Sequence, residues 1–150
     1  DQLMFKKMLV AVDGSKAALR AMEQAIEFQQ MTPDAEIFLI CVYKHHSLFA
    51  ASLSVGRPED LQIPDDTLAG YAKEIVEHAK QIAIEKGAKN VRGFVKGGRP
   101  SKMIVEFARK KGIDLIVMGA HGTHSDKDGL LLGSVSHRVA SLAHCPTLIV

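Results

Sequence analysis

Residues 113–122 read Ile-Asp-Leu-Ile-Val-Met-Gly-Ala-His-Gly, a short apolar run that ends in two closely spaced glycines. An apolar run of this length, bounded by turn residues, is typical of a buried strand. After ten intervening residues, Gly133-Ser134-Val135 opens a segment with a helical pattern. Glycines let the backbone approach a ligand, and a helix start offers free N–H groups to an anion. The stretch therefore predicts either an anion site or a plain turn followed by a helix that Ser134 caps.

Strand and helix signals alternate along the rest of the chain. The expected strands are the apolar runs 8–12, 36–43, 91–96, 113–118 and 147–150. The expected helices are the segments 16–31, 68–86, 101–111 and 134–143. Ser15 is a suitable N-cap for the first helix, and Gly112 is a suitable stop for the third. This alternation predicts one α/β domain over residues 1–150, with a mostly parallel sheet covered by helices on both faces.

Parallel sheets of this kind bind ligands outside the carboxyl ends of their strands, where the strand order reverses. The connections at that edge are 13–15, 44–66, 97–100 and 119–134. The connection Lys44–Asp66 is unusually long and has no clear periodicity. Loops of that length in a small domain are usually functional lids or disordered. We therefore expect a segment that becomes ordered over a ligand.

Composition excludes several classes of protein. The chain has 150 residues, with 19 basic and 17 acidic side chains and a net charge of +2. The basic residues are scattered, so no nucleic-acid footprint is visible. No apolar run approaches the roughly 18 residues that a membrane span needs. Cys41 and Cys145 lie in apolar stretches without a signal peptide, which favours reduced thiols. A soluble, cytoplasmic protein is expected.

Three motifs resemble those of the universal stress protein family, in its ATP-binding branch. They are Lys-Met-Leu-Val-Ala-Val-Asp-Gly-Ser at 7–15, Asp-Leu-Ile-Val-Met-Gly at 114–119, and Leu-Leu-Gly-Ser-Val-Ser-His-Arg-Val at 131–139 with His-Cys-Pro-Thr-Leu-Ile-Val at 144–150. After its fourth strand that branch carries Gly, two residues, Gly, nine residues and Gly-Ser. Here ten residues, 123–132, separate the second glycine from Gly133. A surface loop can absorb the additional residue.

The resemblance implies a three-layer α/β/α sandwich, a Rossmann-like fold of the adenine nucleotide alpha hydrolase type. Its five-stranded parallel sheet would have the strand order 3-2-1-4-5. The nucleotide-binding residues that it implies are Val12, Asp13, Val42, Met118, Gly119, Gly122, Gly133, Ser134 and Val135.

Each implied residue has a stated role and an ordinary structural alternative. Asp13 would accept hydrogen bonds from the ribose, or would simply orient the turn beside Gly14. Val12 and Val42 would line the adenine, with the Val42 backbone reading its edge, or would be core valines. Met118 and Gly119 would run under the ribose. The phosphates would be held by Gly122, Gly133, Ser134 and Val135.

The resemblance also implies partners. The cofactors would be ATP and Mg²⁺, the ion being held mainly by phosphates and water because no phosphate-loop lysine is present. A homodimer would form through the edge strand Thr147–Val150, whose unpaired backbone groups can pair with a second copy. A transporter partner is implied because the stretch 44–66, from Lys-His-His-Ser-Leu at 44–48 through Pro-Asp-Asp at 64–66, resembles family members that occur beside solute transporters.

Two hypotheses on function remain open at this point. The protein is either a regulatory, nucleotide-sensing dimer or a slow ATPase or self-phosphorylating enzyme. The only visible base and nucleophile are His121 and Ser134, and loop histidines are usually solvated. Flavodoxins, receiver domains and dinucleotide-binding dehydrogenases are disfavoured, because their phosphate loops, phospho-acceptor Asp and Gly-x-Gly-x-x-Gly are missing.

Overall fold

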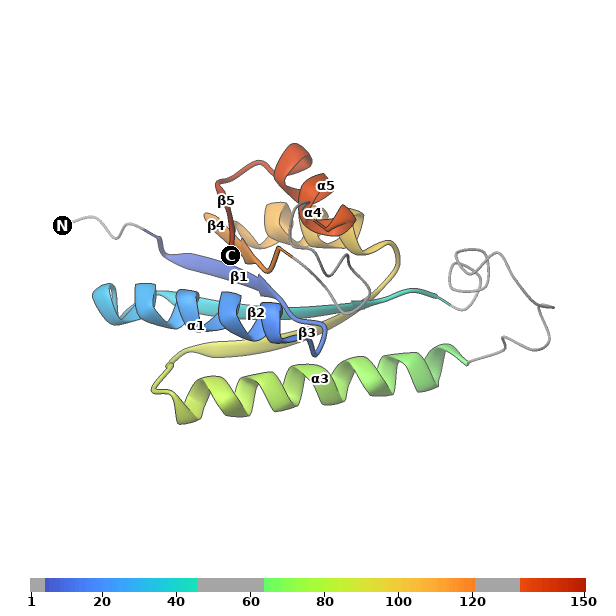
Figure 1. Ribbon diagram of the computed structural model, residues 1–150, viewed down its shortest axis with the longest axis horizontal. Coiled ribbons are helices and arrows are strands. Elements are labelled where there is room, and N and C mark those ends of the chain that lie inside the picture. The colour runs from blue at the N-terminus through green and yellow to red at the C-terminus, as the bar shows by residue number, and fades with distance from the viewer. Residues whose placement is uncertain (1–4, 46–63, 121–132) are drawn as a thin grey trace.

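Five parallel strands form a sheet in the order β3-β2-β1-β4-β5 (Figure 1). The computed structural model describes residues 5–45, 64–120 and 133–150. The strands are β1 Lys7–Ala11, β2 Glu36–Tyr43, β3 Val91–Gly97, β4 Leu115–Met118 and β5 Thr147–Ile149. The helices are α1 Lys16–Met31, α3 Asp65–Glu85, α4 Pro100–Lys111 and α5 Ser134–Leu142. The expected fold class and strand order are both confirmed.

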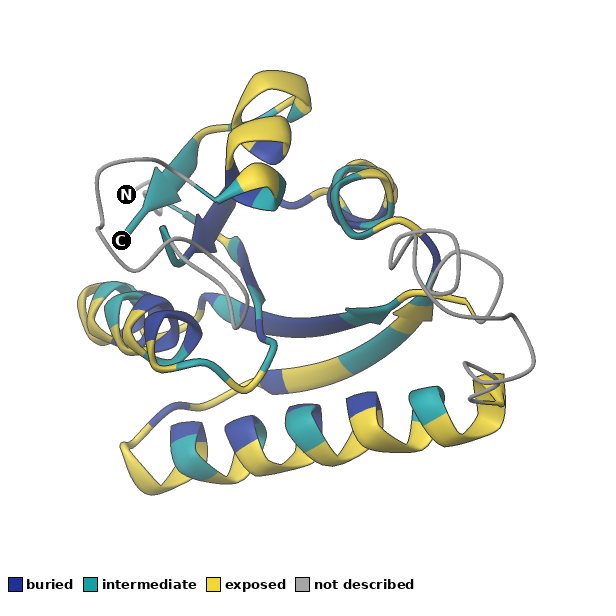
Figure 2. Cartoon of the chain, turned by 45° about the vertical axis from the view of Figure 1, so that its right-hand side comes forward, coloured by how far each residue is buried: buried dark blue, intermediate teal, exposed yellow. Residues whose placement is uncertain are grey.

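Helices cover both faces of the sheet and divide the core into two layers (Figure 2). One layer lies under α1 and α3 and takes Met8 and Val10 from the central strand β1. The other lies under α4 and α5 and takes Leu9 from the same strand. Successive side chains of a strand point to opposite faces, so a strand that is apolar throughout can serve both layers.

The ends of the elements follow local chemistry. Ser15 caps α1 as expected, because its Oγ accepts a hydrogen bond from the Ala18 N–H at 3.1 Å. Gly112 ends α4 in the left-handed conformation, at a φ of 68°. The strand β4 begins two residues later than expected. Asp114 precedes β4, and the Asp114 carboxylate accepts a hydrogen bond from the Lys6 N–H at 2.8 Å.

The helix α3 begins at Asp65, three residues earlier than the apolar spacing indicated, so Asp65 and Asp66 belong to the helix rather than to the long connection. Carboxylates in a first turn stabilise a helix through its dipole. Residues 46–63, most of the expected lid, lie outside the described residues. Within the described ranges, no helix has the length and apolar character needed to cross a membrane.

Candidate functional site

The expected site lies at the carboxyl edge of the sheet, where the strand order reverses between β1 and β4 (Figure 1). The chain leaves β1 into α1 on one face, and α5, which follows β4, lies on the other face. Such a crossover leaves a crevice between the two connections. Eight of the nine expected binding residues are described and lie at this edge or at the start of α5. Gly122 lies outside the described residues.

The backbone of Val42 points towards the space beyond the end of β1. The Ile40 carbonyl accepts a hydrogen bond from the Val12 N–H at 2.8 Å, and the Tyr43 carbonyl accepts one from the Gly98 N–H, beyond β3, at 2.9 Å. In a parallel ladder the N–H and C=O of one residue point to the same side, and the side alternates along the strand. The backbone N–H and C=O of Val42 therefore point to the β1 side, as those of Ile40 do.

This leaves an open peptide edge on β2. The paired register of β1 and β2 ends at Ala11 with Ile40, and after Val12 the chain turns away into α1. Among the described residues, no backbone hydrogen bond joins the N–H or C=O of Val42 to the turn that follows β1. A neighbouring donor and acceptor in one plane match the edge of a heteroaromatic ring that carries an acceptor nitrogen and an amino group.

The side chains of Val12 and Val42 do not form one wall. Val12 is 3% exposed and packs in the core layer under α1 and α3. Val42 is half-buried against the layer under α4 and α5. Only the backbone of Val42 and the chain around Val12 are therefore placed to border the same ligand.

Asp13 organises the turn between β1 and α1. Its Oδ1 accepts a hydrogen bond from the Ser15 N–H at 2.9 Å. Gly14, between them, has a φ of 85°, which favours glycine because a side chain would be strained there. The structural role considered for Asp13 is therefore present. A carboxylate has about four acceptor positions, so a role in the turn does not conflict with accepting hydrogen bonds from a ligand.

Gly119 is required by packing. A Cβ at this position would lie 2.7 Å from the Cβ of Ala17 and 2.8 Å from its carbonyl carbon. The end of β4 and the first turn of α1 thus meet at backbone distance. Met118 is 5% exposed and belongs to the layer under α4 and α5. Sequence reasoning missed Ala17, because only the sheet register brings it against Gly119.

The start of α5 differs from expectation. Gly133, with φ −60° and ψ 152°, is the N-cap, and no side chain caps the helix. Ser134 is instead the first helical residue, and its side chain is exposed, so the expectation that Ser134 caps the helix is wrong. A serine caps from the N-cap position, where its oxygen can accept from the N–H of the second or third helical residue, and Ser134 lies one residue past that position. Among the described residues, no side-chain acceptor serves the first-turn N–H groups of α5.

A short hydrogen-bonded stem holds the start of α5 against the sheet. The Val150 N–H donates to the Met118 carbonyl at 2.8 Å, and the Val150 carbonyl accepts from the Ala120 N–H at 2.9 Å. The Ala120 carbonyl in turn accepts from the Gly133 N–H at 2.7 Å. The residues on either side of 121–132 are therefore fixed next to each other and next to β5.

The negative charge of Asp13 affects the pKa of a neighbouring thiol, that of Cys41. Burial and, to a smaller extent, the negative charge of Asp13 together raise the pKa of Cys41 to about 11. Cys41 is 5% exposed and is a free thiol. The sequence offered no sign of this neighbour, because 28 positions separate the two residues and only the pairing of β1 with β2 brings them together.

Comparison with known proteins identifies the family of this chain. The model of the universal stress protein family matches residues 4–150. The chain is 37% identical over 152 residues to universal stress protein YxiE of Bacillus subtilis, covering 98% of this chain and 99% of that protein. Among solved structures it resembles universal stress protein UspA from Lactobacillus plantarum, with 29% identity, a TM-score of 0.75 and 97% of each chain covered.

A further solved structure holds a nucleotide. It is a universal stress protein in complex with cAMP, to which this chain is 26% identical with a TM-score of 0.71, over 97% of each chain. Because the family model and a relative above 30% identity both span almost the full length, the assignment does not depend on any one motif. The chain therefore belongs to the universal stress protein family.

Proposed function

We propose that this protein binds an adenine nucleotide, ATP with Mg²⁺, at the carboxyl edge of β1, β2 and β4, and that it is a cytoplasmic regulatory protein. The observation that carries the proposal is the open peptide edge of Val42, which lies beside the Asp13 turn at the crossover of the sheet. Adenine presents an acceptor nitrogen next to an amino group, so it complements a peptide N–H and C=O. A universal stress protein in complex with cAMP supports this choice of base.

The remaining groups suit a nucleotide that extends from β2 towards α5. Asp13 would accept from the ribose hydroxyls, and Met118 and Gly119 would lie beneath the sugar. The phosphates would meet the first-turn N–H groups of α5 at Gly133, Ser134 and Val135, where the helix dipole favours negative charge.

Magnesium in such a site would take most of its ligands from phosphates and water. In the described part of the chain, no three His, Cys, Asp or Glu side chains are grouped as metal ligands. When bound, the ion would neutralise charge on the triphosphate. Gly122, which the resemblance assigns to the phosphates, lies outside the described residues.

Calorimetric titration with ATP and Mg²⁺ tests the proposal, with NAD and FMN as comparators. We expect ATP to bind more tightly than either. Asp13→Ala should weaken ATP binding by about 1–3 kcal/mol, the range of hydrogen bonds that involve a charged group. Ser15→Ala is the matched control, because it removes the α1 cap in the same turn without removing the proposed ribose acceptor. If both variants bind ATP with the affinity of the parent, Asp13 does not take part in nucleotide binding.

The alternative function, slow hydrolysis or self-phosphorylation, depends on Ser134. Its side chain is exposed at the start of α5, where the phosphates are proposed to lie. His121, the base considered with it, lies outside the described residues. Phosphate release by the purified protein, compared with Ser134→Ala, separates the two functions. Turnover that disappears in the variant would favour an enzyme over a nucleotide sensor.

The regulatory role includes a homodimer through β5. Within the described residues this strand pairs with β4 alone. The Pro146 carbonyl and the Val150 peptide face β4, so by alternation the N–H groups of Thr147 and Ile149 face the open edge. Open edges pair readily with a second copy about a two-fold axis. Strand pairing across this edge would join two sheets into one.

Ile149→Pro removes an outward donor without deleting an N–H that serves β4. We expect it to shift the protein from dimer to monomer in analytical ultracentrifugation. Ile149→Thr is the control, because it changes the side chain and keeps the N–H. A parent that is monomeric at micromolar concentration would refute the dimer.

A solute transporter is the partner that we propose for this dimer, on the resemblance of residues 44–48 and 64–66 alone. Co-sedimentation with native membranes, with and without ATP, tests it. Association that does not depend on ATP would contradict nucleotide-controlled binding.

A further inference from the structure

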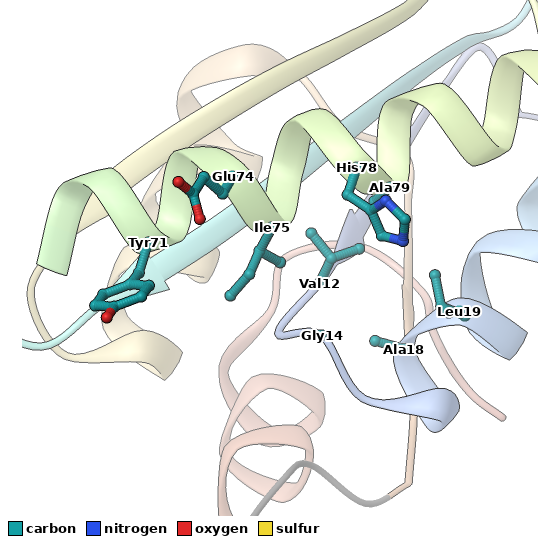
Figure 3. Close-up of a pocket in the computed structure, with 9 residues that line it drawn as sticks. All are labelled: Val12, Gly14, Ala18, Leu19, Tyr71, Glu74, Ile75, His78 and Ala79. Atoms are coloured by element: carbon teal, nitrogen blue, oxygen red, sulfur yellow. The ribbon is translucent and has the colours of Figure 1, made fainter.

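A groove lies between α1 and α3, next to the turn that follows β1 (Figure 3). Its volume is about 270 Å³, near the lower end of the range for small-molecule pockets. Apart from Val12 and Gly14, none of the proposed nucleotide-binding residues or their neighbours in that turn lines it. The lining residues are Val12, Gly14, Ala18, Leu19, Tyr71, Glu74, Ile75, His78 and Ala79.

Small side chains create this space. Ala18 of α1 and Ala79 of α3 are 5% and 2% exposed, and each stands where a larger residue would fill the gap between the helices. The two helices meet on either side of the gap. A Cβ on Gly14 would lie 4.0 Å from the Ile75 side chain, and Lys86 pairs with Glu23 at 3.7 Å. The end of α3 is therefore paired with α1, and Ile75 lies near the turn at Gly14.

The floor of the groove is apolar and its rim is polar. Val12 is buried at the floor, and Ile75 and Leu19 line the sides. Tyr71, Glu74 and His78 lie on α3 at spacings of three and four residues, so they share one side of the helix. Figure 3 shows Ile75 projecting towards the β1–α1 turn and His78 directed towards Leu19, whereas Tyr71 lies further along α3, to the left of that turn.

The rim favours a positive charge. Glu74 is a carboxylate, and Tyr71, at 63% exposed, offers an aromatic ring to a ligand. Carboxylates and aromatic faces both attract ammonium groups. No lysine or arginine is among the described lining residues, where His78 is the only basic side chain.

We propose that this groove binds a small apolar molecule that carries a protonated amine. The apolar body would lie on Val12, Ile75 and Leu19, and the amine would lie between Glu74 and the Tyr71 ring. Because Gly14 is part of the wall, the bound molecule would contact the turn that carries Asp13. The groove adjoins the proposed nucleotide site at Val12, whose side chain lies in the layer under α1 and α3, but the proposal does not depend on nucleotide binding.

Phenethylamine is the probe, titrated into the millimolar range against the full chain in two-dimensional NMR. We expect saturable shifts of the Ile75 and Leu19 methyl signals. Phenylacetate, which carries the opposite charge on a similar body, should produce no saturable shift. Phenylethanol, which is neutral, should bind more weakly than the amine. Equal binding of all three probes would overturn the proposal, as would the absence of saturable shifts.

Two variants on the exposed side of α3 test the role of charge without disturbing the core. Glu74→Gln should weaken phenethylamine binding by about three- to fivefold, the range of an exposed ion pair. Glu77→Gln is the matched control, because it removes the same charge from the same helix outside the lining residues. Equal losses in both variants would mean that the helix attracts the amine only through its net charge, and would overturn the proposed site.

Discussion

The first turns of α1 and α5 stand at the same edge of the sheet, but they are completed differently. At α1, Asp13 orients the turn and the Ser15 hydroxyl accepts from the Ala18 N–H, so the helix start is closed by its own side chains. At α5, the N-cap is Gly133, which has no side chain to offer. Its peptide is instead engaged with Ala120.

The two helix starts therefore differ in whether their first-turn N–H groups are already capped or remain available to a ligand. Backbone N–H groups in a first turn need an acceptor, and a helix that lacks a cap leaves them to solvent or to a ligand. At α1 the protein supplies that acceptor, which stabilises the fold. At α5 no described side chain supplies it, which is the condition that the proposed phosphate site needs. Four predictions test this comparison, in order of decreasing effect.

Gly133→Val should reduce ATP affinity by at least about a hundredfold, or roughly 2.8 kcal/mol. The φ of −60° at this position suits any residue, so backbone strain is not the reason. The reason is that a branched side chain would occupy the space proposed for the phosphates. Calorimetric titration measures the affinity, and thermal unfolding checks that the variant is folded. A folded variant that binds as the parent does would place the phosphates elsewhere.

Gly119→Ala should destabilise the protein by about 1–3 kcal/mol, the usual cost of overpacking. The new Cβ would lie 2.7 Å from the Ala17 Cβ, in the first turn of α1. Gly70→Ala is the control, because a Cβ there meets nothing within 4 Å, and removing a helical glycine should stabilise by about 0.5–1 kcal/mol. Urea unfolding measures both. Similar unfolding midpoints for the two variants would show that α1 can move away from β4.

Gly133→Ser should make α5 resemble α1. A serine at the N-cap can accept from the N–H groups of Val135 or Ser136, which should stabilise the helix by a few tenths of a kcal/mol. The same bond should compete with phosphate and lower ATP affinity by about tenfold, near the lower end for a hydrogen bond to a charged group. Unchanged affinity in calorimetry, together with increased stability, would show that the phosphates do not use these groups.

The smallest expected effect is a change in the pKa of Cys41 when the charge of Asp13 is removed. The Cys41 pKa of about 11 exceeds the 9.0 of a free thiol, so between these values the unfolded thiol ionises first and stability falls as pH rises. Removing the charge with Asp13→Asn should lower the pKa by less than burial raises it. Thiolate absorbance during a pH titration measures the pKa, and Cys41→Ala identifies its signal. A Cys41 pKa that is the same in Asp13→Asn and in the parent would contradict the contact.

The two helix starts also show what could be predicted from the sequence. Ser15 was predicted as a cap because its side chain acts three residues along the chain, and the strands were predicted because their apolar runs are local. At α5, both Gly133 and Ser134 are acceptable N-caps, and only the stem through Ala120 decides between them. A local pattern cannot contain that information.

The remaining features depend on register and on contacts between distant segments. The open peptide edge of Val42 depends on the residue of β2 at which β1 ends, and the sequence of one strand alone does not specify that register. The contact of Gly119 with Ala17 and the groove beside Ala79 require two helices to be placed on the sheet. Small residues at such positions have no periodic signal, so their importance appears only in the folded chain.

The stem at Met118, Val150, Ala120 and Gly133 bears on how this family can vary. The ends of residues 121–132 are held by the sheet, so the position of Gly133 does not depend on the length of chain between them. Closing a loop of this size with one residue more costs below about 0.1 kcal/mol. We therefore expect insertions, deletions and grafted peptides to be tolerated there while the start of α5 stays in place. The stem is an attachment point at which evolution, or a protein engineer, can exchange one sequence for another.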